Sequence, residues 1–141
     1  MINYDKFKKS LKHLELQLEN YERAVDRPEL NELDREALTE SVIKRFERCW
    51  NTLWKVFRRY LNEELGLPDV PTSPKPILRL ANENKLLATP IEQWLRYANA
   101  RNDNVNEYDE AKAAADCLEL LPDFLDDAIG LYQTMTGTSW E

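Results

Sequence analysis

Residues suited to binding a ligand are concentrated between positions 101 and 108, where the sequence reads Arg-Asn-Asp-Asn-Val-Asn-Glu-Tyr. Asn and Asp favour local hydrogen bonds to the backbone over helix interiors, so such a run seldom serves packing. The Arg101 guanidinium, with the amides of Asn102 and Asn106, could bind a phosphate or stabilise a developing negative charge. Tyr108 adds a phenol. The structural alternative is a turn between helices, in which Arg101 caps carbonyl groups and Tyr108 packs.

The rest of the chain offers few residues for catalysis. Its one histidine, His13, has no nucleophile placed beside it by any sequence pattern. The two cysteines, Cys49 and Cys117, lie in helical apolar patterns without metal-ligand spacing, which favours buried free thiols in a reducing compartment. There is no glycine-rich phosphate-binding loop. We therefore expect no metal and no cofactor.

Helices must position these residues, and the first helix shows the clearest pattern. Its apolar residues follow alternating spacings of three and four, which places them in one stripe along a helix. The stripe comprises Tyr4, Phe7, Leu11, Leu14, Leu18, Tyr21 and Val25. The Arg27-Pro28 step should end this helix, because the residue before a proline avoids helical geometry.

A second, longer helix is expected from Asn31 or Asp34 to about Leu65, where Gly66 and Pro68 should stop it. Two neighbouring apolar stripes make its buried face wide, so it should pack on two or three other helices and form the centre of the bundle. The first stripe is Leu38, Val42, Phe46, Cys49, Leu53, Val56 and Tyr60, and the second is Ile43, Trp50, Trp54, Phe57 and Leu61.

Proline and capping signals divide the remaining sequence. Residues 67–76 should form a stiff linker, and Ser73-Pro74 should cap a short helix that contains Ile77 and Leu80. Thr89-Pro90-Ile91-Glu92 indicates a capping box, and the helix that follows should fray around residues 100–104.

The last helix is expected to begin at Asp109, whose carboxylate suits the N-terminal end of a helix. Pro122 should bend or break it, and Gly137 lies near its end. The elements together predict an all-α fold. We expect an antiparallel bundle of about five helices around a four-helix up-and-down core, in a single domain of residues 1–141.

Composition narrows the class of protein. A chain of 141 residues with 43% hydrophobic residues can bury a real core. Its net charge of −7 argues against a general basic coat for nucleic acids. No stretch approaches the roughly 20 apolar residues that cross a bilayer, and the first residues lack the apolar core of a signal peptide. We expect a soluble, cytoplasmic protein without a membrane partner.

Charge is also unevenly distributed along the chain. Six basic residues against one acid, Glu47, lie between positions 44 and 59: Lys44, Arg45, Arg48, Lys55, Arg58 and Arg59. Seven acids against Lys112 lie between positions 109 and 127: Asp109, Glu110, Asp116, Glu119, Asp123, Asp126 and Asp127. The two helices could pair within or between subunits, or the basic helix could dock RNA or an acidic partner.

A series of short motifs resembles a known family across residues 5 to 135. They are Ile43-Lys44-Arg45-Phe46-Glu47, a proline-bearing linker, Ile77-Leu78-Arg79-Leu80-Ala81, Trp94-Leu95-Arg96-Tyr97 and Arg101-Asn102. The chain is similar to the nucleotidyltransferase substrate-binding proteins, small all-helical members of the HEPN superfamily. These include HepT-type toxins paired with minimal nucleotidyltransferase antitoxins. The resemblance implies an HEPN-like fold.

The resemblance also implies roles for the polar segment. Arg101 matches the family arginine that would hold a scissile phosphate, Asn102 matches the next asparagine, and Tyr108 matches a tyrosine that a partner transferase can modify with AMP. Asn106 stands where the family has a histidine. An amide cannot act as a general base near pH 7, whereas histidine can, because its pKa lies near 6.5. The segment therefore retains its binding groups and lacks its proton carrier.

Three functions follow as hypotheses. The first is a non-catalytic substrate-binding subunit of a separately encoded minimal nucleotidyltransferase, in a toxin–antitoxin-like pair. The second is a metal-independent ribonuclease toxin with the degenerate motif of Arg101, Asn106 and Tyr108. The third is a plain helical interaction module. The resemblance implies a homodimer in which the Arg101 segments of two subunits line a shared cleft, and the wide apolar face of the second helix allows one.

Overall fold

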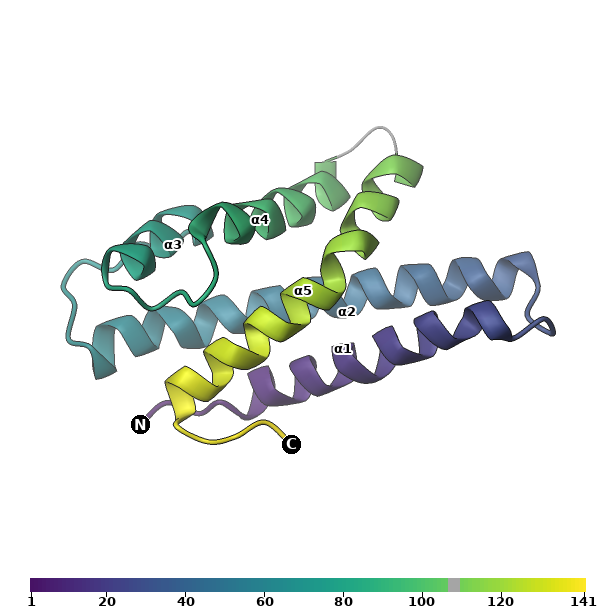
Figure 1. The fold of residues 1–141 in the computed structure, drawn as a ribbon. Coiled ribbons are helices and arrows are strands. Elements are labelled where there is room, and N and C mark those ends of the chain that lie inside the picture. The colour runs from purple at the N-terminus through teal and green to yellow at the C-terminus, as the bar shows by residue number, and fades with distance from the viewer. Residues whose placement is uncertain (107–109) are drawn as a thin grey trace.

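The computed structural model describes the backbone of residues 1–106 and 110–141, and the side chains of residues 1–101 and 112–141. Five helices form the described chain: α1 (Asp5–Arg23), α2 (Glu32–Arg59), α3 (Pro74–Glu83), α4 (Ile91–Asn106) and α5 (Glu110–Thr136). The described residues contain no strand. Helices α1 and α2 lie antiparallel, α4 runs above them, and α5 returns across both (Figure 1). The expected all-α helical bundle is confirmed.

The N-terminal helix buries most of its predicted stripe. Phe7, Leu11, Leu14 and Leu18 are buried in α1, whereas the side chain of Val25 is 82% exposed. The α-helix ends at Arg23 and continues as a 3-10 turn, Ala24–Asp26. A 3-10 turn has about 3.0 residues per turn in place of 3.6, so it rotates Val25 off the stripe and Ala24 is buried instead. The expectation for Val25 was wrong.

The N-terminus of α2 is held by a complete capping box. The Asn31 side chain accepts a hydrogen bond from the backbone N–H of Asp34 at 2.8 Å, and the Asp34 carboxylate accepts one from the backbone N–H of Asn31 at 3.0 Å. At the other end a π-helical turn, Tyr60–Glu64, prolongs the helix. Gly66, with a φ of 65°, follows it and supplies the predicted stop.

The core is built around one ring of α5. Phe124 lies edge-on to Phe46 of α2, with ring centroids 4.9 Å apart, and edge-on to Tyr97 of α4 at 5.3 Å. Trp50 and Trp94 complete the cluster at 6.1 and 6.5 Å from Phe124. Edge-to-face aromatic pairs add about 0.5–1.5 kcal/mol beyond the area that they bury. Three helices therefore share one aromatic cluster, with α2 on one side of it.

The capping predictions for the two middle helices are confirmed only in part. Ser73 precedes α3 and Pro74 opens it, but the Ser73 side chain makes no capping hydrogen bond. Helix α4 begins at Ile91, one residue after Pro90. The Thr89 hydroxyl donates to Asp127 of α5 and its oxygen is still able to accept, so the capping box at Thr89 stays a prediction.

Helix α4 also extends further than its asparagines suggested. It continues to Asn106, so the fraying expected around residues 100–104 is not observed. Ala98 and Ala100 are buried, and burial of a helix face stabilises a helix more than intrinsic propensity does. Pro122 lies inside α5 without breaking it. The predicted start at Asp109 lies outside the described residues.

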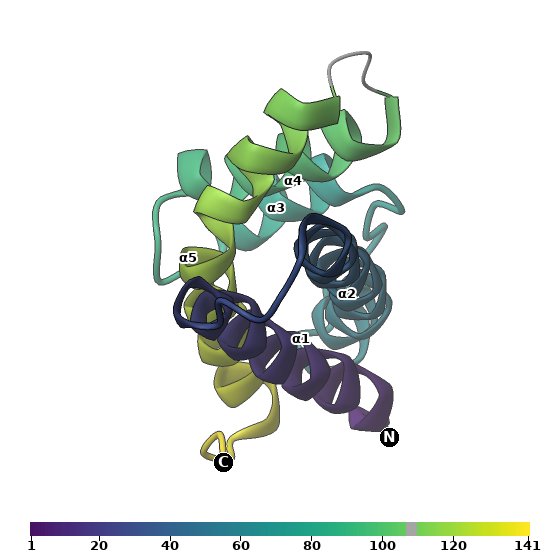
Figure 2. The same cartoon turned by 90° about the vertical axis from the view of Figure 1, so that its right-hand side faces the viewer.

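The view along the α1–α2 pair shows α5 on one side and α3 with α4 on another (Figure 2). The C-terminal segment returns to α1, where the Trp140 indole N–H donates to the Glu15 carboxylate at 3.2 Å. Within the described part of the chain, no helix is long and apolar enough to cross a membrane.

Candidate functional site

Arg101 is the part of the predicted polar segment whose side chain the structure describes. It lies on α4 and reaches α2, where its Nη1 is 3.8 Å from Oε2 of Glu47. The two side chains are 23% and 22% exposed, so the pair is partly shielded from solvent. Because 3.8 Å exceeds hydrogen-bond distance, Arg101 and Glu47 form an ion pair without a hydrogen bond.

The Arg101 guanidinium keeps hydrogen-bonding capacity. Its Nε is buried and has no hydrogen-bond partner among the residues whose side chains the structure describes. A buried donor without a partner costs on the order of 1–3 kcal/mol, more for a charged group, so it needs an explanation where it occurs. Guanidinium is planar and carries only donors, a geometry that matches the oxygens of phosphate and carboxylate groups. The arrangement can bind an anion in competition with Glu47.

A part-buried hydrogen-bond network fixes α4 one turn before Arg101. Tyr97 is fully buried, and its hydroxyl donates to Oδ2 of Asp127 at 2.5 Å while accepting from Nε2 of Gln93 at 3.1 Å. Thr89 donates to the other oxygen of Asp127 at 2.5 Å. Burial, followed by the hydrogen bond to the Asp127 carboxylate, raises the pKa of Tyr97, so the phenol remains a donor. The network joins α4 to α5 and so positions Arg101.

The other predicted site residues are less fully placed. Asn102 and Asn106 belong to the last turns of α4, but only their backbone is described. Tyr108 lies outside the described residues. The structure therefore brings Arg101 together with Glu47, a residue that the sequence interpretation did not assign to the site. In the sequence Glu47 stands out as the one acid of a basic stretch, and it closes the family motif that begins at Ile43.

The single histidine lies on the far side of α2 from Arg101. His13 of α1 is half-buried, and its Nδ1 is 3.0 Å from Nη1 of Arg45. Arg45 and Glu47 are two residues apart, which corresponds to a rotation of about 200° around a helix. Arg45 thus faces α1 while Glu47 faces α4. His13 does not replace the family histidine at Arg101.

The expected pairing of basic and acidic helices is not found within the part of the chain that the structure describes. Arg59 pairs with Glu63 at 2.7 Å, Arg58 donates to the backbone carbonyl of Pro71, and Asp127 accepts from two hydroxyl groups. No basic side chain between positions 44 and 59 forms an ion pair with a described carboxylate of α5. Pairing between subunits and docking of RNA stay predictions.

Comparison with solved structures supports the fold. A crystal structure of a protein from Thermus thermophilus superposes with a TM-score of 0.65 and 25% sequence identity, covering 87% of this chain and 98% of the other. No functionally curated protein matches the chain significantly. The family described as "Nucleotidyltransferase substrate binding protein like" matches residues 2–137. The chain belongs to this family.

Membership in this family confirms the resemblance to nucleotidyltransferase substrate-binding proteins, whereas the HEPN-like and HepT-type assignments stay predictions. The matched range spans all five helices, including the α4 segment that carries Arg101. The family description names substrate binding.

Proposed function

We propose that this protein is the non-catalytic substrate-binding subunit of a separately encoded minimal nucleotidyltransferase, in a pair of toxin–antitoxin type. Two observations support the proposal. The chain belongs to a family named for nucleotidyltransferase substrate binding, and the Nε of Arg101 has no hydrogen-bond partner among the described side chains. The second observation carries the proposal, because it gives substrate binding a specific residue.

In this proposal Arg101 holds a phosphate-bearing group at the end of α4. Glu47 restrains the guanidinium through charge attraction and is displaced as the anion arrives. The amides of Asn102 and Asn106 donate further hydrogen bonds, and Tyr108 is presented at the junction. Nucleotidyl transfer belongs to the partner, and this chain contributes by orienting the reacting group.

A homodimer with a shared cleft at the Arg101 segments remains part of the proposal, but on the resemblance alone. The wide apolar face of α2 was the sequence feature that allowed a dimer. In the structure Phe46, Trp50, Leu53 and Phe57 of that face are buried within the subunit. A dimer would therefore use another surface. Light scattering after gel filtration would show whether the chain has twice the monomer mass.

The ribonuclease alternative lacks a proton carrier. Asn106 is an amide, and His13 bonds to Arg45 on the opposite side of α2 from Arg101. Loss of a general acid–base group lowers a rate by about 10²- to 10⁴-fold. Incubating RNA with the purified protein and with Asn106→His tests this alternative. Cleavage by the unmodified protein, lost in Arg101→Ala, would favour a ribonuclease over a binding subunit.

Co-purification with the nucleotidyltransferase encoded nearest to this chain tests the proposed function. We expect one complex by gel filtration and mass measurement, and nucleotidyl transfer that depends on this chain. Arg101→Gln should leave the complex intact and reduce transfer, whereas Arg79→Gln, the same change at an exposed residue of α3, should affect neither. The proposal fails if the proteins do not co-elute, or if both variants behave alike. A complex that survives with undiminished transfer in Arg101→Gln and Tyr108→Phe would favour the plain interaction module.

A further inference from the structure

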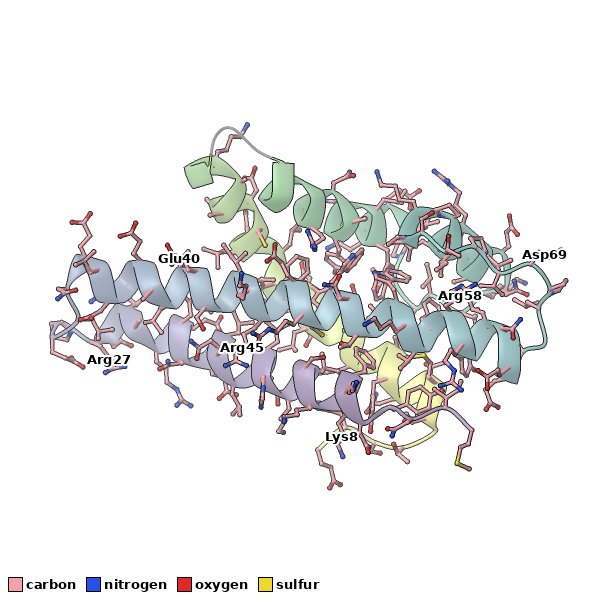
Figure 3. The ribbon with its side chains drawn as sticks, turned by 180° about the vertical axis from the view of Figure 1, so that it is seen from behind. Lys8, Arg27, Glu40, Arg45, Arg58 and Asp69 are labelled. Atoms are coloured by element: carbon pink, nitrogen blue, oxygen red, sulfur yellow. The ribbon has the colours of Figure 1, made fainter. Side chains whose placement is uncertain are left out.

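A second polar site lies between α1 and α2, on the side away from Arg101. It is a groove of about 430 Å³, a volume within the range of small-ligand pockets. Four cations line it: Lys6 and Lys9 from α1, and Arg45 and Arg48 from α2. Figure 3 looks onto this side of the molecule and shows Arg45 between the two helices. We call these residues, together with His13, the basic groove.

Helix periodicity explains why these side chains converge. Lys6, Lys9 and His13 are three and four residues apart on α1, and Arg45 and Arg48 are three apart on α2, so each set lies on one helix face. The two faces meet because α1 and α2 are antiparallel, with His13 opposite Arg45.

Neutral polar contacts hold the two helices in register beside the basic groove. Ser10 and Thr52 share a hydrogen bond of 2.7 Å and both line the groove. One turn beyond His13, Gln17 donates to the Ser41 hydroxyl at 2.9 Å. The walls of the groove are therefore tied to each other at three levels, which limits the rearrangement needed when a ligand binds.

The charge of the basic groove is not neutralised within the described chain. None of its lining residues is acidic, and none of its four cations forms an ion pair with a described residue. The protein as a whole carries −7, so this concentration of positive charge is local. Several cations around one concave site attract anions and raise their local concentration.

His13 adds a directed donor. Guanidinium has no acceptor, so Arg45 must donate to Nδ1 of His13, which therefore carries no proton. The one proton of the neutral ring is then on Nε2, and this N–H can donate to a ligand. Arg45 is half-buried and held by this hydrogen bond, so its side chain loses less conformational entropy on binding a ligand than the exposed lysines do.

We propose that the basic groove binds a phosphate-bearing ligand of nucleotide size, and that it recognises the phosphates. Arg45 and Arg48 supply fork-shaped donors that suit phosphate oxygens, and Lys6 and Lys9 supply point charges. Apart from the imidazole, none of the described residues that line the groove is aromatic. Single-stranded nucleic acids are usually held by bases stacked on aromatic side chains, so an oligophosphate fits this lining better than a run of bases.

Isothermal titration of the purified full-length chain with ATP, inorganic tripolyphosphate and adenosine tests the proposal. Both phosphates should bind, adenosine should not, and added salt should weaken binding. Equal affinities for ATP and tripolyphosphate would identify the phosphates alone as the ligand. Affinity at least about tenfold higher for ATP would identify a nucleotide.

Matched variants locate the binding. Arg48→Gln should weaken binding of tripolyphosphate by about tenfold, as expected for one lost charge-assisted hydrogen bond, and Lys9→Gln should weaken it as well. Arg79→Gln on α3 is the matched control and should leave it unchanged, whereas Arg101→Gln on α4 should remove only the separate binding at Arg101. The proposal is overturned if neither phosphate binds, if Arg79→Gln weakens binding as much as Arg48→Gln, or if only Arg101→Gln does. Binding of an RNA oligomer without binding of either phosphate would also overturn it.

Because Arg48 and Lys9 lie at the surface of the groove, outside the buried core, their variants are expected to fold, and circular dichroism would verify this. Loss of binding at Arg101 with normal binding in the basic groove would separate the two sites. The groove proposal uses the isolated chain, so its outcome does not depend on whether a transferase partner exists.

Discussion

Arg45 and Glu47 are two residues apart on α2, yet their side chains leave the helix in opposite directions. Arg45 bonds to His13 of α1, and Glu47 attracts Arg101 of α4. One helix thus separates two polar sites that differ in their local charge. The basic groove has no acidic lining residue, whereas Arg101 already has a carboxylate nearby. Each site can be altered without touching the residues of the other.

Replacing Tyr97 by phenylalanine should destabilise the protein. The change removes the hydroxyl that donates to Asp127 and leaves a part-buried carboxylate with one donor fewer. Hydrogen bonds to charged groups contribute about 1.5–3 kcal/mol, so the free energy of unfolding should fall by about that much. Urea denaturation measures it. Tyr21→Phe, at a half-buried tyrosine of α1, is the control and should change little.

The contribution of Tyr97 to stability should depend on pH in the alkaline range. Its pKa is raised in the folded protein, first by burial and then by Asp127, so the unfolded chain loses the phenolic proton at lower pH. Above about pH 10 the unfolded state binds fewer protons, and the free energy of unfolding falls as pH rises. The stability difference between the unmodified protein and Tyr97→Phe should therefore shrink above about pH 10. A difference that stays constant to about pH 11 would contradict this prediction.

The Cys49 thiol should be inert in the folded protein. Burial raises its pKa to about 12, against a weaker opposing effect of Ser10, so almost no thiolate forms at neutral pH. Iodoacetamide should modify Cys49 slowly in the native state and rapidly in urea, which peptide mass mapping can follow. Rapid native labelling would mean that α1 and α2 separate often enough to expose the thiol.

The contribution of the capping box at the start of α2 to the free energy of unfolding should be measurable with a single substitution. Asn31→Ala removes the acceptor for the backbone N–H of Asp34 and should cost about 1 kcal/mol of stability. Asn31→Asp keeps an acceptor oxygen and should retain most of it. If the alanine and aspartate variants unfold at the same urea concentration, the cap contributes nothing at this helix end.

The helices were predictable because burial leaves a periodic trace in sequence. The stripes of α1 and α2 were found from local spacing, and the start of α2 was expected at Asn31 or Asp34, of which the structure makes Asn31 the N-cap. The contact of Glu47 with Arg101 was not predicted, because it depends on how two helices distant in sequence are rotated against each other. The hydrogen bond that Thr89 donates to Asp127 of α5 was not predicted either, for the same reason. Val25 was misplaced because the regular spacing conceals a 3-10 turn.

The tryptophans in the aromatic cluster around Phe124 provide an intrinsic spectroscopic signal of how the helices pack. Trp50 of α2 and Trp94 of α4 both lie beside this ring of α5, so their environments depend on how α5 is seated. Near-ultraviolet circular dichroism and tryptophan emission would register any loosening of α5 even where total helix content stays constant. Docking of the proposed partner near Arg101, if it shifts α5, could therefore be followed without attaching a dye.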